Sequence, residues 1–198
     1  MKKIILAIAL SVITIFSFAQ KGVHVVSGDP GIIAQKGVFI SAEFDYSEIT
    51  VDGLSLSRYF KTDDDAEENW NEAIKDAEKS FVEEFNDESK KTFRMLLAED
   101  EEVDYYVKVH VLEYQPSKKG VAGKILTGGA GGGGGDVMSG TIDIEDGKTR
   151  EVLCTLEFNG IKGSTAYKFT QSAYMSSTYG DLGTELGEIA VKAAKAKK

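Results

Sequence analysis

Cysteine, histidine and long hydrophobic runs are scarce in this sequence, and each scarcity excludes a class of protein. The single cysteine, Cys154, cannot form an intramolecular disulfide, so a packed core must stabilise the fold. The two histidines, His24 and His110, lie far apart and form neither a zinc-binding pattern nor a catalytic triad, so both are predicted to be surface residues. After the first twenty residues no stretch is hydrophobic enough to span a membrane. We therefore expect no integral membrane segment once those residues are removed.

Basic residues are outnumbered in the chain, with 23 Lys and Arg against 32 Asp and Glu and a net charge of −9. Binding the phosphates of nucleic acid, or an anionic membrane, requires clustered Lys and Arg. The sequence therefore predicts no nucleic-acid partner.

The first nineteen residues have the pattern of a secretory signal peptide. Lys2 and Lys3 precede an apolar run that starts at Ile4, and small residues, Ser17 and Ala19, occupy the minus-three and minus-one sites of a cleavage point. A membrane anchor is the alternative, but an anchor needs about 20 apolar residues and this run is shorter. We predict cleavage before residue 20 and export through the general secretory route to the periplasm or the cell exterior.

Cleavage has two consequences for the mature chain. It removes two lysines and no acid, which leaves 21 basic and 32 acidic residues and a net charge of −11. No cysteine follows the apolar run, so the sequence does not predict a lipoprotein.

Periodicity predicts the first half of the fold. Residues 20–36 are expected to form a loosely ordered N-terminal arm with room for one edge strand. Alternation over residues 37–47 predicts a strand, with its apolar side chains on one face. A helical period then predicts a helix from Ala66 to about Asn86, with Asp65 and Glu68 spaced as a capping box, and residues 90–97 suggest a second short helix. The apolar positions of this helix are Trp70, Ala73, Ile74, Ala77, Phe81 and Phe85.

Alternation returns at residues 105–114 and again on both sides of the turn at Asp146 and Gly147. The side chains expected on the core face all stand at even positions, so an odd number of loop residues must separate the two strands; they are Ile142, Ile144, Val152, Cys154, Leu156 and Phe158. We predict a loop of residues 145–147 with Gly147 left-handed in a bulge. A closing helix is expected from about Leu182, with Gly183 and Gly187 letting it lie close on the sheet.

These elements predict an α+β fold in the order β-α-β-β-β-α. We expect an antiparallel sheet of about four to five strands with the two main helices packed on one face. The length allows one core, so residues 37–198 are assigned to a single domain with a flexible glycine-rich loop at residues 127–136.

Glycine fills seven of the eight positions from Gly128 to Gly135. A dinucleotide or phosphate site would require the run to open a helix or precede a Lys-Ser or Lys-Thr pair, and a strand pattern follows instead. We therefore interpret the run as a flexible connection. Together with flanking lysines it is a candidate interaction loop, with Lys124, Gly128, Gly129, Gly131 and Gly135 as its residues.

Other residues suggest chemistry only weakly. Cys154 shares the apolar strand face and is predicted to be a buried, unreactive thiol. The acids of residues 63–68 lack the spacing of a calcium loop. Glu43 and Asp45 leave open a pair of catalytic carboxylates. The aromatic residues that follow the last strand either cover the sheet or line a groove for a glycan or peptide; they are Tyr167, Phe169, Tyr174 and Tyr179. No catalytic, cofactor or metal site is predicted.

Four parts of this chain follow an order known from exported bacterial envelope domains. They are the strand YYVKVHVLEY, the glycine-rich link, the strand pair GTIDIEDGKTREVLCTLEF and the helix from about Leu182. This order resembles the periplasmic domain of the curli secretion channel and the amino-terminal domain of the Tol system's propeller protein. The resemblance implies an assembly or binding part of the envelope rather than an enzyme. The lipid-anchor cysteine of many such domains and the membrane hairpins of the channel have no counterpart here.

The sequence therefore favours an exported, non-enzymatic interaction or assembly module that meets an envelope protein or glycan through its sheet edge or glycine loop. The alternatives are a carboxylate-dependent hydrolase and a small-ligand carrier of the envelope.

Overall fold

The structure, a computed structural model, describes residues 21–89, 92–97, 102–117, 135–163 and 170–197. The predicted signal peptide and most of the glycine run lie outside the described residues. The elements, in chain order, are β1 (Gly22–Gly28), η1 (Pro30–Ala34), β2 (Phe39–Asp45), β3 (Thr50–Val51), β4 (Leu54–Ser55), α1 (Leu56–Tyr59), α2 (Ala66–Ser89), β5 (Arg94–Leu97), β6 (Tyr105–Gln115), β7 (Val137–Asp146), β8 (Val152–Lys162) and α4 (Gln171–Ala196).

The α+β class is confirmed, but the prediction of four to five antiparallel strands is wrong. The sheet has eight strands in the order β1-β8-β7-β6-β2-β5, with β3 beside β6 and β4 beside β3. It is mixed, because β2 runs parallel to both β5 and β6, while β6, β7 and β8 form an antiparallel meander. The 24-residue helix α2, which lies between β2 and β5 in the chain, makes a crossover connection that returns the chain to the end of the sheet where β2 begins, so β5 pairs with β2 in parallel.

The stretch predicted as a second short helix is strand β5. Its four residues pair with residues 39–42 of β2, and Phe93 and Met95 are buried. An apolar run this short fits a helical and a strand period equally well, so only its pairing with β2 distinguishes the two.

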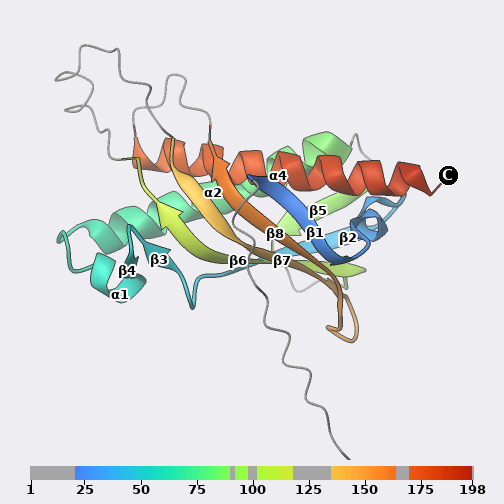
Figure 1. The fold of residues 1–198 in the computed structure, drawn as a ribbon, viewed down its shortest axis with the longest axis horizontal. Helices are drawn as coiled ribbons and strands as arrows, with labels where there is room; N and C mark the ends of the chain where they lie inside the picture. Colours follow the sequence, from blue (N-terminus) through green and yellow to red (C-terminus); the bar gives the residue numbers. More distant parts are fainter. Residues whose placement is uncertain (1–20, 90–91, 98–101, 118–134, 164–169, 198) are drawn as a thin grey trace, which may run out of the picture.

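The predicted apolar faces of the long strands are confirmed, except at Val152, which is 49% exposed because the register shift next to Leu153 pairs it with Glu145 and not with an even position. Even positions from 138 to 144 on β7 and from 154 to 158 on β8, and odd positions from 107 to 111 on β6, are buried beneath the two long helices, both of which lie on one side of the sheet (Figure 1). The fully buried side chains of these strands are Val107, Val109, Val111, Tyr114, Met138, Ile142, Ile144, Cys154, Leu156 and Phe158. The predicted apolar stripe of α2 is buried throughout as well. The core therefore lies between one sheet face and the helices.

The hairpin between β7 and β8 places even-numbered residues of the two strands opposite each other, as predicted, but not by means of the predicted loop. Ile144 pairs with Cys154, so even positions do face even positions. The predicted loop of residues 145–147 is wrong, however, because the loop is residues 147–150 and a register shift next to Leu153 supplies the odd residue. A four-residue loop plus a one-residue bulge gives the same parity as an odd loop.

Gly147 is also not the left-handed residue of this hairpin; that residue is Arg150, at φ 59°. Gly147 is required for a close approach instead. A Cβ there would stand 2.0 Å from the carbonyl oxygen of Val103, and the Gly147 N–H donates to the Asp104 carbonyl at 2.9 Å. The glycine thus lets the hairpin pack against the start of β6.

Helix α4 begins at Gln171, well before the predicted start at Leu182. The side chain of Thr170 caps it by accepting a hydrogen bond from the Ala173 N–H at 3.2 Å. Tyr174 and Tyr179 therefore lie on a helix and are buried, and the Tyr179 ring lies 5.9 Å from that of Phe44 on β2, which agrees with sheet cover and not with an exposed aromatic groove. Tyr167 and Phe169 lie outside the described residues.

The glycines of α4 contact helix α2, not the sheet as predicted. A Cβ at Gly183 would stand 2.2 Å from the carbonyl oxygen of Phe81, and one at Gly187 would stand 2.8 Å from the Glu88 Cβ. The two long helices therefore cross with their backbones in close approach, and a side chain at Gly183 has no room.

None of the helices in the described part of the chain is both long and apolar enough to cross a membrane.

We predict that Gly183→Ala lowers the free energy of unfolding by about 1–3 kcal/mol, because the added methyl group collides with rigid backbone of α2. Gly180→Ala is the matched control. Its Cβ would meet the flexible Glu84 side chain at 3.1 Å and Ser80 only at an ordinary contact distance of 3.9 Å, and alanine favours the helix by about 1 kcal/mol. Urea unfolding of both variants checks this prediction, and equal effects would contradict the close backbone contact.

Candidate functional site

Of the residues predicted to form an interaction loop, Lys124, Gly128, Gly129 and Gly131 lie outside the described residues. Gly135 is described and is buried directly before β7. Interaction through the glycine-rich loop therefore stays a prediction.

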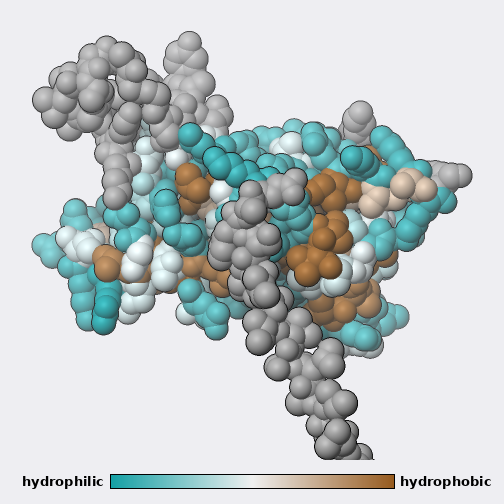
Figure 2. Space-filling model, in the orientation of Figure 1, coloured by the Kyte–Doolittle hydropathy of each residue, from teal (hydrophilic) through white to brown (hydrophobic). Residues whose placement is uncertain are grey.

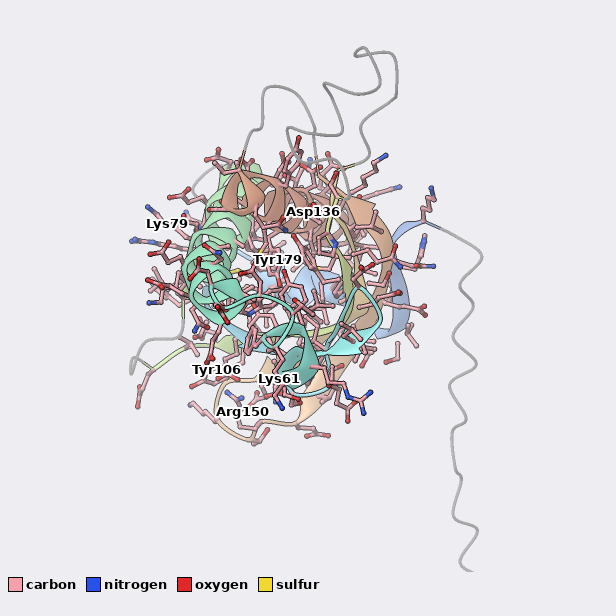
Figure 3. All side chains as sticks on the ribbon, turned by 90° about the vertical axis from the view of Figure 1, so that its left-hand side faces the viewer. Lys61, Lys79, Tyr106, Asp136, Arg150 and Tyr179 are labelled. Carbon is pink, nitrogen blue, oxygen red and sulfur yellow. The ribbon has the colours of Figure 1, made fainter. Side chains whose placement is uncertain are left out.

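A buried carboxylate, Asp136, stands where that loop joins β7. It accepts hydrogen bonds from the Tyr114 hydroxyl, from the Ser117 N–H at 2.7 Å and from the Gln171 amide at 3.3 Å. These three donors come from the end of β6 and the start of α4, and Figure 3 shows Asp136 beneath α4. Asp136 therefore ties together both ends of the loop and the first turn of the last helix.

The electrostatics of Asp136 combine opposing effects. Burial raises the pKa of the Asp136 carboxyl, and the hydrogen bonds from Tyr114 and Ser117 lower it. Burial and the neighbouring carboxylate also raise the pKa of Tyr114, so its hydroxyl stays protonated and available as a donor. The group is satisfied by the chain itself, which makes it a structural anchor. The only sequence signal for it is an acid placed directly before an apolar strand.

The sheet face opposite the helices carries a network of paired charges. Arg150 makes two hydrogen bonds to Glu43, at 2.9 and 2.7 Å, and an ion pair with Glu145 at 2.8 Å. Its guanidinium also lies 3.7 Å from the centre of the Tyr106 ring, on the side of the sheet away from α4 (Figure 3). Beside this group, His110 contacts Asp45 at 3.1 Å and Asp143 at 3.6 Å. The prediction that His110 is a surface residue is confirmed in part, since its side chain is 26% exposed.

A hollow of about 670 Å³ lies at the border of the sheet where the predicted carboxylate pair stands. It is lined by Ala42, Glu43, Phe44, Asp45, Glu78, Leu97 and Lys108. A pair of catalytic acids would require raised pKa values. Hydrogen bonds from Arg150 lower the pKa of Glu43, and the backbone N–H of Ser47, more than His110, lowers that of Asp45.

Glu78, which the sequence analysis did not single out, is the carboxyl of this hollow with a raised pKa, owing to burial. It accepts a hydrogen bond from the Tyr46 hydroxyl at 2.9 Å. In the sequence, Glu78 stands four residues after Ile74, on the flank of the buried stripe of α2, and this spacing could have indicated a partly buried carboxyl group. One such group does not make the pair that the hydrolase alternative requires, because Glu43 is already paired with Arg150 and Asp45 already contacts His110 and the Ser47 N–H.

The remaining candidate residues carry no reactive arrangement. Cys154 is fully buried, as predicted, and burial raises the pKa of its thiol to about 11. Among the described residues, no group of three or more His, Cys, Asp or Glu side chains could hold a metal ion.

An apolar cluster is exposed at the edge of the sheet formed by β1. It consists of Val25 and Val26 on β1 with Val152 and Leu153 at the start of β8, which are between 38 and 53% exposed. The two strands pair here, with Ser27 opposite Thr155 and Gly28 opposite Cys154. Figure 2 shows hydrophobic residues gathered over β1 and the start of β8, on a face that is otherwise largely hydrophilic. We refer to these four side chains as the β1 cluster.

The backbone of β1 is accessible along its outer side. Strand β1 ends the strand order of the sheet and pairs with β8 alone among the described strands. Its first outward N–H, on Val23, donates to the Glu185 carboxylate of α4 at 2.9 Å. No residue from Gly22 to Gly28 is charged, so β1 lacks the Lys, Glu or Pro with which edge strands commonly discourage pairing; its protection is a bulge beside Val26.

Comparison with known proteins adds little to this geometry. No family model matches the chain, and no curated protein matches it. Its structure is similar to the PelC dodecamer from Paraburkholderia phytofirmans at 14% identity and a TM-score of 0.44, over 83% of this chain and 96% of that one. A leucine-to-methionine variant of the same PelC dodecamer matches at 15% identity and a TM-score of 0.44, over 83% and 97% of the two chains. A similarity this distant carries no argument about function, and neither structure supports the resemblance to the curli and Tol domains.

We predict that Asp136→Asn lowers the free energy of unfolding by about 1–3 kcal/mol, because an amide group cannot accept from all three donors. Chemical unfolding at neutral pH measures this cost. Asp64→Asn, at an exposed position, is the control and should change stability little. A cost no larger than that of the control would show that Asp136 does not anchor the loop ends.

The ion pair between Glu43 and Arg150 predicts a pH dependence of stability. Because the folded pKa of Glu43 lies below its ordinary value of 4.5, the pair stabilises the fold above that pH and ceases to do so as the pH falls through the folded pKa. The Arg150 side chain is 41% exposed, so solvent screening limits the contribution to about 0.5–1 kcal/mol. Glu43→Gln should therefore lose this amount at pH 7 and nothing in acid. Glu83→Gln, in the exposed pair with Lys79, should cost little at either pH.

Proposed function

We propose that this chain is an exported, non-enzymatic interaction module of the bacterial cell envelope that binds another protein chain along edge strand β1. The observation that carries the proposal is the β1 cluster, which exposes four large apolar side chains beside an uncharged strand edge. Contiguous exposed apolar surface is typical of protein contacts.

Strand addition is the mode of binding that this edge suits. An extended segment placed beside β1 would hydrogen-bond to its outward backbone groups, and the valines would be buried against alternate side chains of the added strand. The opposite end of the strand order offers less, since β5 has only four residues and begins with the exposed Arg94.

A protein partner is favoured over a glycan by the position of the aromatic residues. Sugar-binding grooves present exposed aromatic rings, and Tyr174 and Tyr179 are buried on α4. The β1 cluster is aliphatic, which favours a protein strand.

Export is the second part of the proposal and rests on the predicted signal sequence. Amino-terminal sequencing of the exported protein should therefore begin at Gln20.

The test is site-specific photo-crosslinking in intact cells. A photoreactive phenylalanine at Val26, which is 53% exposed, should give a discrete, repeatable cross-linked protein product. The matched control is the same group at Phe39, which is 51% exposed on β2, several strands away, and should give no such product.

A Val26→Lys variant is expected to remove partner binding without unfolding, because an exposed edge lysine opposes strand pairing. Equal products at the two positions, or none at Val26, would contradict the proposal.

A further inference from the structure

We infer that the chain that occupies the β1 edge is a second copy of this protein, with the two β1 strands paired antiparallel around Val25. This inference rests on the proposed function, whose partner it identifies. It makes the module self-assembling through a two-fold axis, the commonest symmetry of protein oligomers.

Charge complementarity is the first argument. The segment KGVHVVSGD, residues 21–29, is uncharged between Lys21 and Asp29, which stand four residues before and four residues after Val25. An antiparallel pair centred on Val25 therefore brings Lys21 of each copy to the end of the strand where Asp29 of the other copy lies. The bulge beside Val26 adds one residue of offset, which the long and exposed Lys21 side chain can span. A parallel pair would bring like charges together, so the pattern selects the antiparallel arrangement.

The free backbone groups give the second argument. The Val23 N–H points outward to Glu185, and successive N–H groups of a strand alternate between its two sides. The N–H and C=O of Val25 therefore also point outward, beyond the position that Glu185 occupies. A two-fold axis at Val25 lets these groups of the two copies bond reciprocally while each Val23 N–H keeps its own acceptor.

The charge of the whole molecule gives the third argument. Each copy carries a net charge of −9, or −11 after the predicted cleavage, so most of its surface repels a second copy. Gly22 to Gly28 contains no acid, and the β1 cluster meets its own copy there with apolar side chains of matching kind. This edge is thus a place where self-association avoids the general repulsion.

Asp29 already has partners in its own chain, and the ion pair among them must be kept in the test. It forms an ion pair with Lys197 and accepts from the Gly31 N–H at 3.0 Å, capping η1. A variant that reverses the charge at Asp29 should therefore also reverse Lys197, so that the local ion pair survives with its charges exchanged.

The experiment mixes two charge-reversed variants of the exported full chain. Variant one is Lys21→Glu, and variant two combines Asp29→Lys with Lys197→Glu. Each variant alone should dimerise at least roughly tenfold more weakly than the wild type, because like charges meet at both ends of the paired strands. An equimolar mixture should restore dimerisation as heterodimers. At one end of the paired strands, the glutamate that replaces Lys21 in variant one meets the lysine that replaces Asp29 in variant two. At the other end, the native Asp29 of variant one meets the native Lys21 of variant two. Sedimentation equilibrium and native mass spectrometry measure both quantities.

Two controls keep the result interpretable. Lys36→Glu makes the same charge change at an exposed position away from β1 and should dimerise as the wild type does. Circular dichroism establishes that each variant is folded before it is mixed.

The outcomes separate this inference from the proposed function. Wild-type protein that stays monomeric while Val26 cross-links to a different protein overturns the inference and leaves the function standing. A monomer with no cross-link at Val26 overturns both. A dimer that Lys21→Glu weakens no more than Lys36→Glu, or a mixture that forms no heterodimer, shows that the copies pair elsewhere and overturns the inference.

Discussion

The close crossing of α2 and α4 sets the arrangement of the other elements. The missing Cβ of Gly183 lets the α4 backbone approach the Phe81 carbonyl oxygen, so both long helices fit side by side over one face of the sheet. With wider spacing, the two apolar stripes would not both reach the central strands. Because both helices occupy the same face, the opposite face and the β1 edge remain open to solvent, and the candidate surfaces of the protein lie there.

The two open regions differ in character. The open face brings acids of β2 and β7 next to His110 and Arg150, and these groups largely contact one another. Groups that already satisfy each other gain little from a new partner, because binding would first break existing ion pairs. The β1 edge is uncharged and exposes valines and a backbone without a neighbouring strand. An arriving chain there exchanges water for apolar contact and hydrogen bonds, which favours binding.

Asp136 links this architecture to the glycine-rich segment. A carboxylate buried away from water is tolerated only with several donors, and it recruits them from the end of β6 and the first turn of α4. The segment therefore leaves and returns at one point on the molecule, beside the N-terminus of the last helix. The predicted flexibility of the segment is compatible with a rigid domain because its ends are held.

The local pattern of the chain predicted most of the buried side chains, with Val152 as an exception that the bulge in β8 exposes. The buried stripe of α2 and the apolar faces of β6, β7 and β8 were predictable, because side-chain direction follows the local period of a helix or strand. The buried thiol of Cys154 followed from the same alternation. For the candidate site, the sequence allowed one edge strand within residues 20–36 and named the sheet edge as a possible contact surface.

How those elements meet could be read only from the folded chain. Four features depend on partners distant in the sequence. They are the parallel pairing of β2 with β6, the assignment of residues 94–97 to a strand, the start of α4 at Gln171 and the contact of Gly183 with α2. The hairpin shows the same limit, since a loop of residues 147–150 with a bulge has the parity of a simple odd loop. Local periodicity records which face of an element is apolar, but not what covers it. For that reason, only the folded structure showed that β1 lies at the sheet edge beside β8. The inferred pairing of Lys21 with Asp29 of a second copy depends on that position.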